Sequence, residues 1–279
     1  MLEILRGFPR RPAPGRPGDP GLFEPGSVAW KVNGETAMLV GGGRALLMQL
    51  AHPAVAAAVD EHSDFPLQPY ERLWRTLESM LTITFGDAEQ SAAAAERVNT
   101  VHRRVVGATY RAMDPKLLLW VHATLVDSAL VVYDRFVGSL VPSQRERYYR
   151  DMKRQAVALN VPSSVLPGNL GDFDRYVRKQ LPQLEVTDRA RALASEIVSP
   201  PVPLALRPAA ALFGLVTVGL LPDQLRAAYG YRWNGPKSWS LTATQASVRS
   251  VVRFLPPPLR RWPHARAAQR RMDLVSAPP

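Results

Sequence analysis

Two histidines lie inside apolar stretches of this chain, where a buried imidazole needs a hydrogen-bond partner or a metal. His102 belongs to RVNTVHRRVV and His122 to PKLLLWVHATL, and both stretches have apolar residues at helical spacing. A neutral imidazole has one donor and one acceptor nitrogen, and the acceptor nitrogen can bind iron. Each residue is therefore either a hydrogen-bonded core histidine or an iron ligand.

The helix expected after Asp87 turns His102 inward. Six residues share its arc at about 100° per residue: Val98, Val101, Val105, Val106, Thr109 and Ala112. His122 lies in a segment that is apolar almost all round, which predicts a central helix. His52 precedes Pro53 at a helix end, a place suited to a hydrogen-bonding or propionate-binding imidazole.

A polar group also follows the helical period in ERLWRTLESM. Arg72, Arg75 and Thr76 are spaced i, i+3, i+4, so two guanidinium groups and a hydroxyl share one helical face. Such a face is either an exposed basic surface or the polar wall of a site.

Other candidate sites are weaker. We expect Asp60, Glu61 and Asp64 around His62 to be solvated and to stabilise a turn, and we assign no role to His264. The absence of cysteine excludes disulfides, thiolate metal sites and cysteine nucleophiles. No HExxH, Glu-x-x-His pair or P-loop is present, and GGGRAL at 41–46 is interpreted as a close helix contact.

Helical periodicity nearly everywhere predicts an all-α fold with a single multi-helix domain over 30–270. The N-terminal segment 1–29, rich in proline and arginine, is predicted to be a mobile arm, and 271–279 a C-terminal tail. Proline-rich stretches are expected to form corners between helices. The expected helices span about 35–51, 69–84, 88–112, 115–138, 143–159, 171–181, 188–198, 206–229 and 240–270, and prolines are expected to interrupt the last two.

The net charge of +11 comes from dispersed arginines, and no nucleic-acid-binding signature accompanies it. Seven arginines from Arg249 to Arg271 have no acidic residue among them. This zone is interpreted first as a solvated surface and second as a contact for anionic lipid or an acidic partner. The start of the chain has no apolar signal region, and the longest apolar run, 209–221, is short for a membrane span, so we expect a cytoplasmic protein.

Four ordered motifs resemble one family of oxygenases. They are QLAHPAVAAAVDEHSDF, ERLWRTLESMLTITFGD, VNTVHRRVVGATYRAMDPKLLLWVHATL and VPSSVLPGNLGDFDRYVRKQL. They are similar to the family that groups MpaB-type proteins with the catalytic domain of latex-clearing proteins, the rubber oxygenases. The resemblance runs from about residue 30 to 270 and implies an all-helical fold enclosing a haem b pocket. It also implies cleavage of olefinic bonds with O₂.

The same resemblance suggests roles for the polar residues. The distal Arg-x-x-Lys-Thr pattern of the rubber oxygenases falls on Arg72, Arg75 and Thr76, and the proximal histidine falls on His102, with His122 as the main alternative. Arg75 replaces a lysine, and a guanidinium has no lone pair to give to iron near neutral pH. A lysine-capped six-coordinate iron is therefore not expected here.

The leading hypothesis is a haem b-dependent oxygenase that acts with O₂ on an isoprenoid, fatty or aromatic substrate. In it, His102 ligates iron, Arg72 and Thr76 donate hydrogen bonds on the opposite side, and Arg75 lines the pocket or binds a propionate. Two other classes stay open: a haem carrier or sensor without turnover, and a cofactor-free helical protein that associates with membranes through its basic zone.

Overall fold

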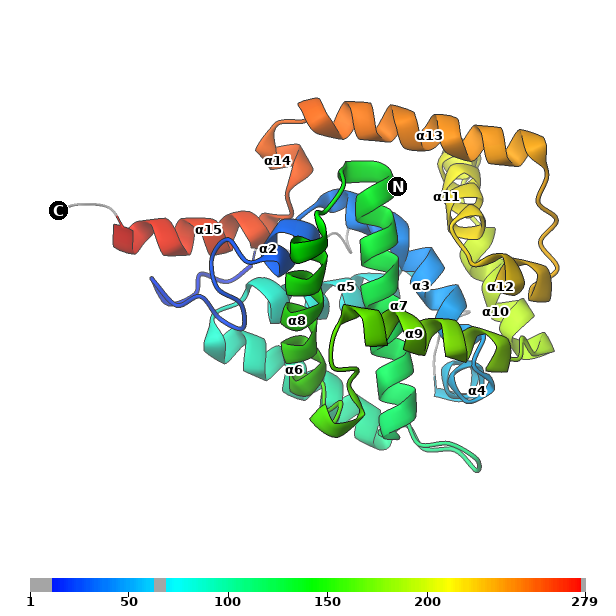
Figure 1. The fold of residues 1–279 in the computed structure, drawn as a ribbon, viewed down its shortest axis with the longest axis horizontal. Coiled ribbons are helices and arrows are strands. Elements are labelled where there is room, and N and C mark those ends of the chain that lie inside the picture. The colour runs from blue at the N-terminus through cyan, green and yellow to red at the C-terminus, as the bar shows by residue number, and fades with distance from the viewer. Residues whose placement is uncertain (1–11, 63–68, 277–279) are drawn as a thin grey trace.

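The prediction of an all-α fold is confirmed by a computed structural model, which describes residues 12–62 and 69–276. Side chains are described except at 69–74 and 276. These residues contain two isolated β-bridges but no β-strand. The helices pack as a bundle around α7, which lies at its centre (Figure 1).

The first half of the chain forms α2 (Val28–Asn33), the 3₁₀ helix η1 (Thr36–Val40), α3 (Gly41–Leu50), α4 (Pro53–His62), α5 (Pro69–Phe85), α6 (Ala88–Arg104), α7 (Pro115–Val132) and the π-turn η2 (Tyr133–Val137). The second half forms α8 (Pro142–Ala158), α9 (Leu170–Gln180), α10 (Asp188–Val198), α11 (Arg207–Gly219), α12 (Asp223–Ala228), α13 (Gly235–Phe254), α14 (Pro257–Arg260) and α15 (Pro263–Ser276). Single 3₁₀ turns η3 (Ser163–Val165), η4 (Leu181–Gln183) and η5 (Leu204–Leu206) join some of them.

The predicted helix starts in the middle of the chain are confirmed. Asp87 Oδ1 accepts from the Gln90 amide at 2.8 Å while Gln90 Oε1 accepts from the Asp87 amide at 3.1 Å, which makes a capping box for α6. Asp114 accepts from the Lys116 amide at 2.7 Å, and Pro115 occupies the first turn of α7.

Prolines interrupt the last two predicted helical stretches, as expected. Pro222 stands at the N-cap of α12 and separates it from α11 within 206–229. The stretch 240–270 forms three helices, because Pro256, Pro257 and Pro263 interrupt the run of backbone donors.

The main error concerns α6, which ends at Arg104 and not near residue 112. Val105 is extended, and the chain turns back so that the Gly107 amide donates to the Tyr110 carbonyl at 3.0 Å. The Tyr110 ring lies so close that a Cβ on Gly107 would be 2.3 Å from it. The Tyr110 hydroxyl donates to Glu61 at the end of α4 at 2.6 Å. A contact 49 residues away therefore helps to end this helix.

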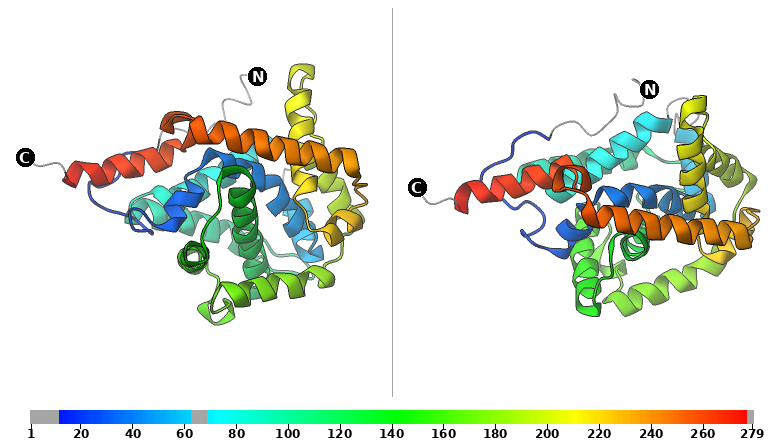
Figure 2. Two further views of the ribbon diagram at one scale, coloured as in Figure 1. Left: turned by 45° about the horizontal axis from the view of Figure 1, so that its top comes forward. Right: turned by 90° about the horizontal axis from the view of Figure 1, so that it is seen from above.

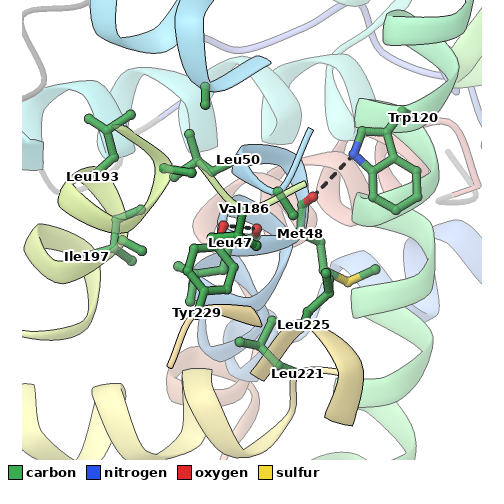
Figure 3. Packing of buried hydrophobic residues seen from close by; sticks show 14 residues of the cluster. Leu47, Met48, Leu50, Trp120, Val186, Leu193, Ile197, Leu221, Leu225 and Tyr229 are labelled. Carbon is green, nitrogen blue, oxygen red and sulfur yellow. Dashed lines mark hydrogen bonds between the residues drawn. The ribbon is translucent and has the colours of Figure 1, made fainter. Parts of the chain in front are cut away.

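The largest core cluster lies between α3, α7, α10 and α12 (Figure 3). Trp120 Nε1 donates to the Met48 carbonyl at 3.2 Å, and the Tyr229 hydroxyl donates to the Leu47 carbonyl at 2.7 Å. Both bonds end on the backbone of α3, so they satisfy buried polar groups while the rings fill the core.

The glycines of α3 permit close helix packing, as predicted. A Cβ on Gly41 would lie 2.9 Å from Val132 Cγ2 of α7, and one on Gly43 would lie 2.2 Å from Thr217 Oγ1 of α11. Arg44 is buried beside them and is paired with Asp127 at 2.7 Å. Its guanidinium also donates to Ser128 Oγ and to the Leu220 carbonyl, so α3, α7 and α11 are joined through one cation.

Among the described residues, Pro115–Val137 is long and apolar enough to cross a membrane by length and composition, and 61% of its most apolar window is buried. This segment is the central α7 and its π-turn. A core helix passes the same test, so the location of the protein stays a prediction.

The described part of the N-terminal segment, residues 12–27, is packed against the helices, which differs from the expected mobile arm. The Phe23 side chain is completely buried beside Trp30 and Phe85. The Gly18 amide donates to the carbonyl of Arg271, a residue that was assigned to the C-terminal tail but lies buried within α15. These ends contact each other because apolar Phe23 and buried Arg271 anchor them to α5.

Candidate functional site

The predicted polar cluster and His102 lie on the two arms of one helical hairpin. α5 and α6 are antiparallel and meet at Gly86, and Met80 and Ile83 of α5 pack with Ala94 and Val98 of α6. Since each residue advances both helices by the same rise, Thr76 stands about level with residue 97 and Arg72 with residue 101. His102 therefore lies at the same open end of the hairpin as Arg72, Arg75 and Thr76.

The described side chains of this cluster lie on the surface. Arg75 and Thr76 are both exposed, and the side chain of Arg72 lies outside the described residues. The hydroxyl of Ser79 donates to the Arg75 carbonyl at 2.9 Å, one turn along α5. A haem pocket bounded by these residues stays a prediction.

His102 is half-buried in the last turn of α6, next to exposed Arg103 and Arg104. The apolar arc that was expected to bury it is wrong, because Val101 is 60% exposed and Val106 is 44% exposed. The helix ends before Val105, so the residues beyond it do not continue the face on which His102 lies.

His122 is buried as predicted, on the central helix α7, with 4% of its surface exposed. Neither ring nitrogen has a hydrogen-bond partner among the described residues. Burial lowers the pKa of His122 to about 4, and the backbone of Met152 in α8 opposes this shift. The imidazole is therefore neutral near pH 7, which is the form that ligates metals.

His52 is half-buried and lies between the end of α3 at Leu50 and the start of α4 at Pro53, so it stands at a helix terminus, as the proline after it predicted. Burial lowers its pKa, and the negative charge of Asp114 at the start of α7 opposes this shift. Its Nδ1 accepts from the Ala54 amide at 3.2 Å. With Nδ1 used as an acceptor, the neutral ring carries its proton on Nε2, a donor suited to a carboxylate.

The acidic segment before residue 63 has a different role from the predicted one. Asp60 and Glu61 are helical, and both are ion-paired with Arg189 of α10, at 2.9 and 3.0 Å. Hydrogen bonds from Tyr110 and Arg189 lower the pKa of Glu61. Asp60 and Glu61 are exposed, as predicted, but the predicted turn is wrong because both residues are helical, and their partners are distant in sequence. Asp64 lies outside the described residues.

Sequence reasoning missed the partner of His264. This histidine is buried in α15, and its Nε2 lies 3.0 Å from Glu78 Oε1 of α5. Both residues line a cavity of about 1230 Å³ between α5, α6, α15 and residues 12–16. The lining does not include His52, His102, His122, Arg75 or Thr76, so this cavity is separate from the predicted site.

Among the described residues, no group of three or more His, Asp or Glu side chains could hold a metal ion. Haem iron needs one axial protein ligand, because the porphyrin supplies four nitrogens. His122 is suited to contact a haem, because its buried ring nitrogens have no hydrogen-bond partner among the described residues. Half-buried His102, which lies beside two arginines, is also suited to contact a haem.

Comparison with known proteins supports the resemblance found in the motifs. Residues 30–256 match the model of the family described as ER-bound oxygenase mpaB/B'/Rubber oxygenase, catalytic domain. The chain belongs to this family. Membership in the mpaB/rubber oxygenase family supports an oxidoreductase activity, since the shared domain is the catalytic domain of oxygenases.

Two curated relatives of this mpaB/rubber oxygenase chain are uncharacterized proteins of Mycobacterium bovis and Mycobacterium tuberculosis. Each is 28% identical over 225 residues, which cover 76% of this chain and 87% of the relative. No solved structure matches the chain significantly.

Proposed function

We propose that this protein is a haem b-dependent oxygenase that acts with O₂ on an apolar substrate of the isoprenoid, fatty or aromatic class. The observation that carries the proposal is the α5–α6 hairpin, which brings His102 to the same end as Arg72, Arg75 and Thr76. Membership in the oxygenase family supports the reaction class.

Each residue has a stated part in the proposal. Haem, when bound, supplies the O₂ and electron-transfer chemistry that these side chains lack. His102 would hold the haem iron, and Arg72 and Thr76 would donate hydrogen bonds from the other arm of the hairpin. Arg75 and His52 would be donors for the haem propionates. His122 is the alternative ligand, because its nitrogens are buried without hydrogen-bond partners among the described residues.

The arginine at position 75 predicts the resting state. A guanidinium remains protonated near neutral pH and has no lone pair, so Arg75 cannot coordinate iron. We expect the ferric protein to be five-coordinate or water-ligated. A resting spectrum typical of two nitrogen ligands would contradict this and would indicate His122 as a second ligand.

The test is haem titration of the purified protein, followed by absorption spectroscopy, with wild type, His102→Ala, His122→Ala and His62→Ala. His62→Ala is the matched control, since this histidine is exposed on α4. We expect a Soret band in wild type and control, and its loss or shift in His102→Ala. Full haem binding in His102→Ala with loss in His122→Ala would transfer the ligand role to His122.

Turnover is measured separately, as O₂ uptake with olefinic isoprenoid, fatty and aromatic substrates. Uptake that depends on haem supports the oxygenase. A Soret band without uptake on any substrate would instead favour a haem carrier or sensor, and a wild-type protein that binds no haem would exclude both.

A further inference from the structure

α13 lies along one edge of the molecule, across the ends of other helices (Figures 1 and 2). Its buried residues are Gln245 and Val252, and most of its surface is exposed. Trp239, Ala246, Ser250 and Arg253 follow at intervals of seven, four and three residues, so they share the outward face. Trp239 is 74% exposed near the start of this face, and Phe254 is 82% exposed at its end.

Further apolar side chains surround the end of α13. Val251 and Leu259, the latter on α14, are also exposed. Trp239 and Phe254 are separated by about 22 Å along the helix at 1.5 Å per residue. Two large aromatic side chains thus stand at the two ends of a polar helical face.

The charge of this region has one sign. No acidic residue occurs between Asp223 and Asp273, and α13 carries exposed Lys237, Arg249 and Arg253. Arg249 donates to the Asp134 carbonyl at 3.3 Å, and the nearby Asp134 carboxylate is already paired with Arg145.

The structure shows that only some of the arginines between Arg249 and Arg271 are free to form an exposed basic surface. Arg260 is paired with buried Glu35 at 2.8 Å, and Arg261 donates to the Trp30 carbonyl at 3.1 Å. Arg271 is buried and donates to the Phe85 carbonyl at 3.0 Å. These three arginines hold α14 and α15 to the domain, so the prediction of a solvated face is wrong for them. Arg249 and Arg253 of that zone remain exposed on α13.

We infer that the outward face of α13, with Leu259 of α14, binds the surface of an anionic lipid bilayer. Trp239, Phe254 and Leu259 enter the boundary between headgroups and acyl chains, and the cations contact lipid phosphates. A second copy of the chain fits this face less well, because two such faces would bring Lys237, Arg249 and Arg253 against the same cations. Bilayer contact would also place the domain where apolar molecules dissolve.

The experiment is co-sedimentation of the full chain with phosphatidylcholine vesicles, with and without phosphatidylglycerol, at low and high salt. Neither haem nor an oxidisable substrate is needed, so the result is independent of the proposed oxygenase activity. We expect binding to anionic vesicles that weakens at about 1 M salt, where the Debye length falls to about 3 Å.

Two variants separate the apolar and the charged contributions. Phe254→Ser/Leu259→Ser should weaken binding about tenfold or more. Arg249→Gln/Arg253→Gln should weaken it about fivefold for each arginine. Val157→Ser is the matched control: Val157 is an exposed apolar residue near Arg150, Lys153 and Arg154 on α8, and this change should leave binding intact. Circular dichroism confirms that each variant is folded.

Four results would overturn the inference. Equal binding to neutral and anionic vesicles would show that the cations do not contribute to binding. Absence of binding to both would show that this face does not bind a bilayer. An equal loss in Val157→Ser would show that the contact is not specific to α13. Self-association of wild type in sedimentation velocity, abolished by Phe254→Ser/Leu259→Ser, would assign the face to a second copy.

Discussion

The contact between α3 and α11 gives a sharp test of the fold, because two adjacent glycines have opposite surroundings. A Cβ on Gly43 would lie 2.2 Å from Thr217 Oγ1, 2.8 Å from Thr217 Cγ2 and 2.9 Å from Phe213 Cζ. Ordinary contacts between such atoms are about 3.5–4.0 Å. In Gly43→Ala the helices must separate by about 1 Å, or Thr217 must leave its rotamer. A Cβ on Gly42 would meet no atom within 4 Å.

The expected free energies follow from these contacts. Alanine in place of a helical glycine stabilises by up to about 1 kcal/mol. That gain is all that Gly42→Ala experiences. In Gly43→Ala, overpacking costs about 3 kcal/mol, which leaves a net loss of about 2 kcal/mol. The two variants should therefore differ by about 3 kcal/mol, or about 6 °C in Tm for a chain of this size.

The assay is thermal and urea unfolding followed by circular dichroism at 222 nm. Thr217 is completely buried, and its hydroxyl has no hydrogen-bond partner among the described residues, so Thr217→Ala costs no hydrogen bond there. Gly43→Ala/Thr217→Ala should recover part of the loss. Equal Tm values for Gly42→Ala and Gly43→Ala, or a Gly43→Ala protein more stable than wild type, would refute the close approach of α3 and α11.

Two further predictions concern buried charge. Arg44→Ala should destabilise by about 3 kcal/mol because the partly buried Asp127 loses its partner. Arg44→Met/Asp127→Leu should recover most of this loss in urea unfolding, and equal losses in both variants would contradict the prediction. For Asp87, burial raises the pKa, but hydrogen bonds from the Gln90 and Arg16 amides and the charge of Arg271 lower it overall. Its stabilisation is therefore present above about pH 4 and is lost as pH falls through its lowered pKa. Asp87→Ala should cost about 1–2 kcal/mol at pH 7 and less at pH 3, and a loss independent of pH would count against the charged cap.

Local sequence determined most of the helices. Apolar periodicity and the caps at Asp87 and Asp114 acted within one or two turns, so α5, α7, α8 and α10 begin and end within two residues of their predicted bounds once η2 is counted with α7. The glycines before Arg44 also indicated a close contact, since a missing side chain is visible in the sequence. The sequence did not show which helix approaches these glycines, α11 or α7.

The errors have a common cause. α6 was predicted too long because its end depends on Tyr110 binding Glu61. The ion pairs of the acidic residues of α4 were missed because Arg189 lies 128 residues from Glu61. The span from Arg249 to Arg271 contains no acidic residue, yet Glu35, 225 residues from Arg260, is buried against it. Ion pairs and hydrogen bonds between residues so far apart in the sequence do not produce a periodic pattern in it.

The candidate site divides in the same way. The sequence by itself determined which residue types could serve an oxygenase, through the order of its motifs and the i, i+3, i+4 spacing of Arg72, Arg75 and Thr76. Only the tertiary structure decided that His102 is half-exposed at the open end of the α5–α6 hairpin while His122 is enclosed against α8. Both histidines follow a helical apolar pattern, but burial is set by the neighbouring helices, because a helix face is covered only where another element packs on it.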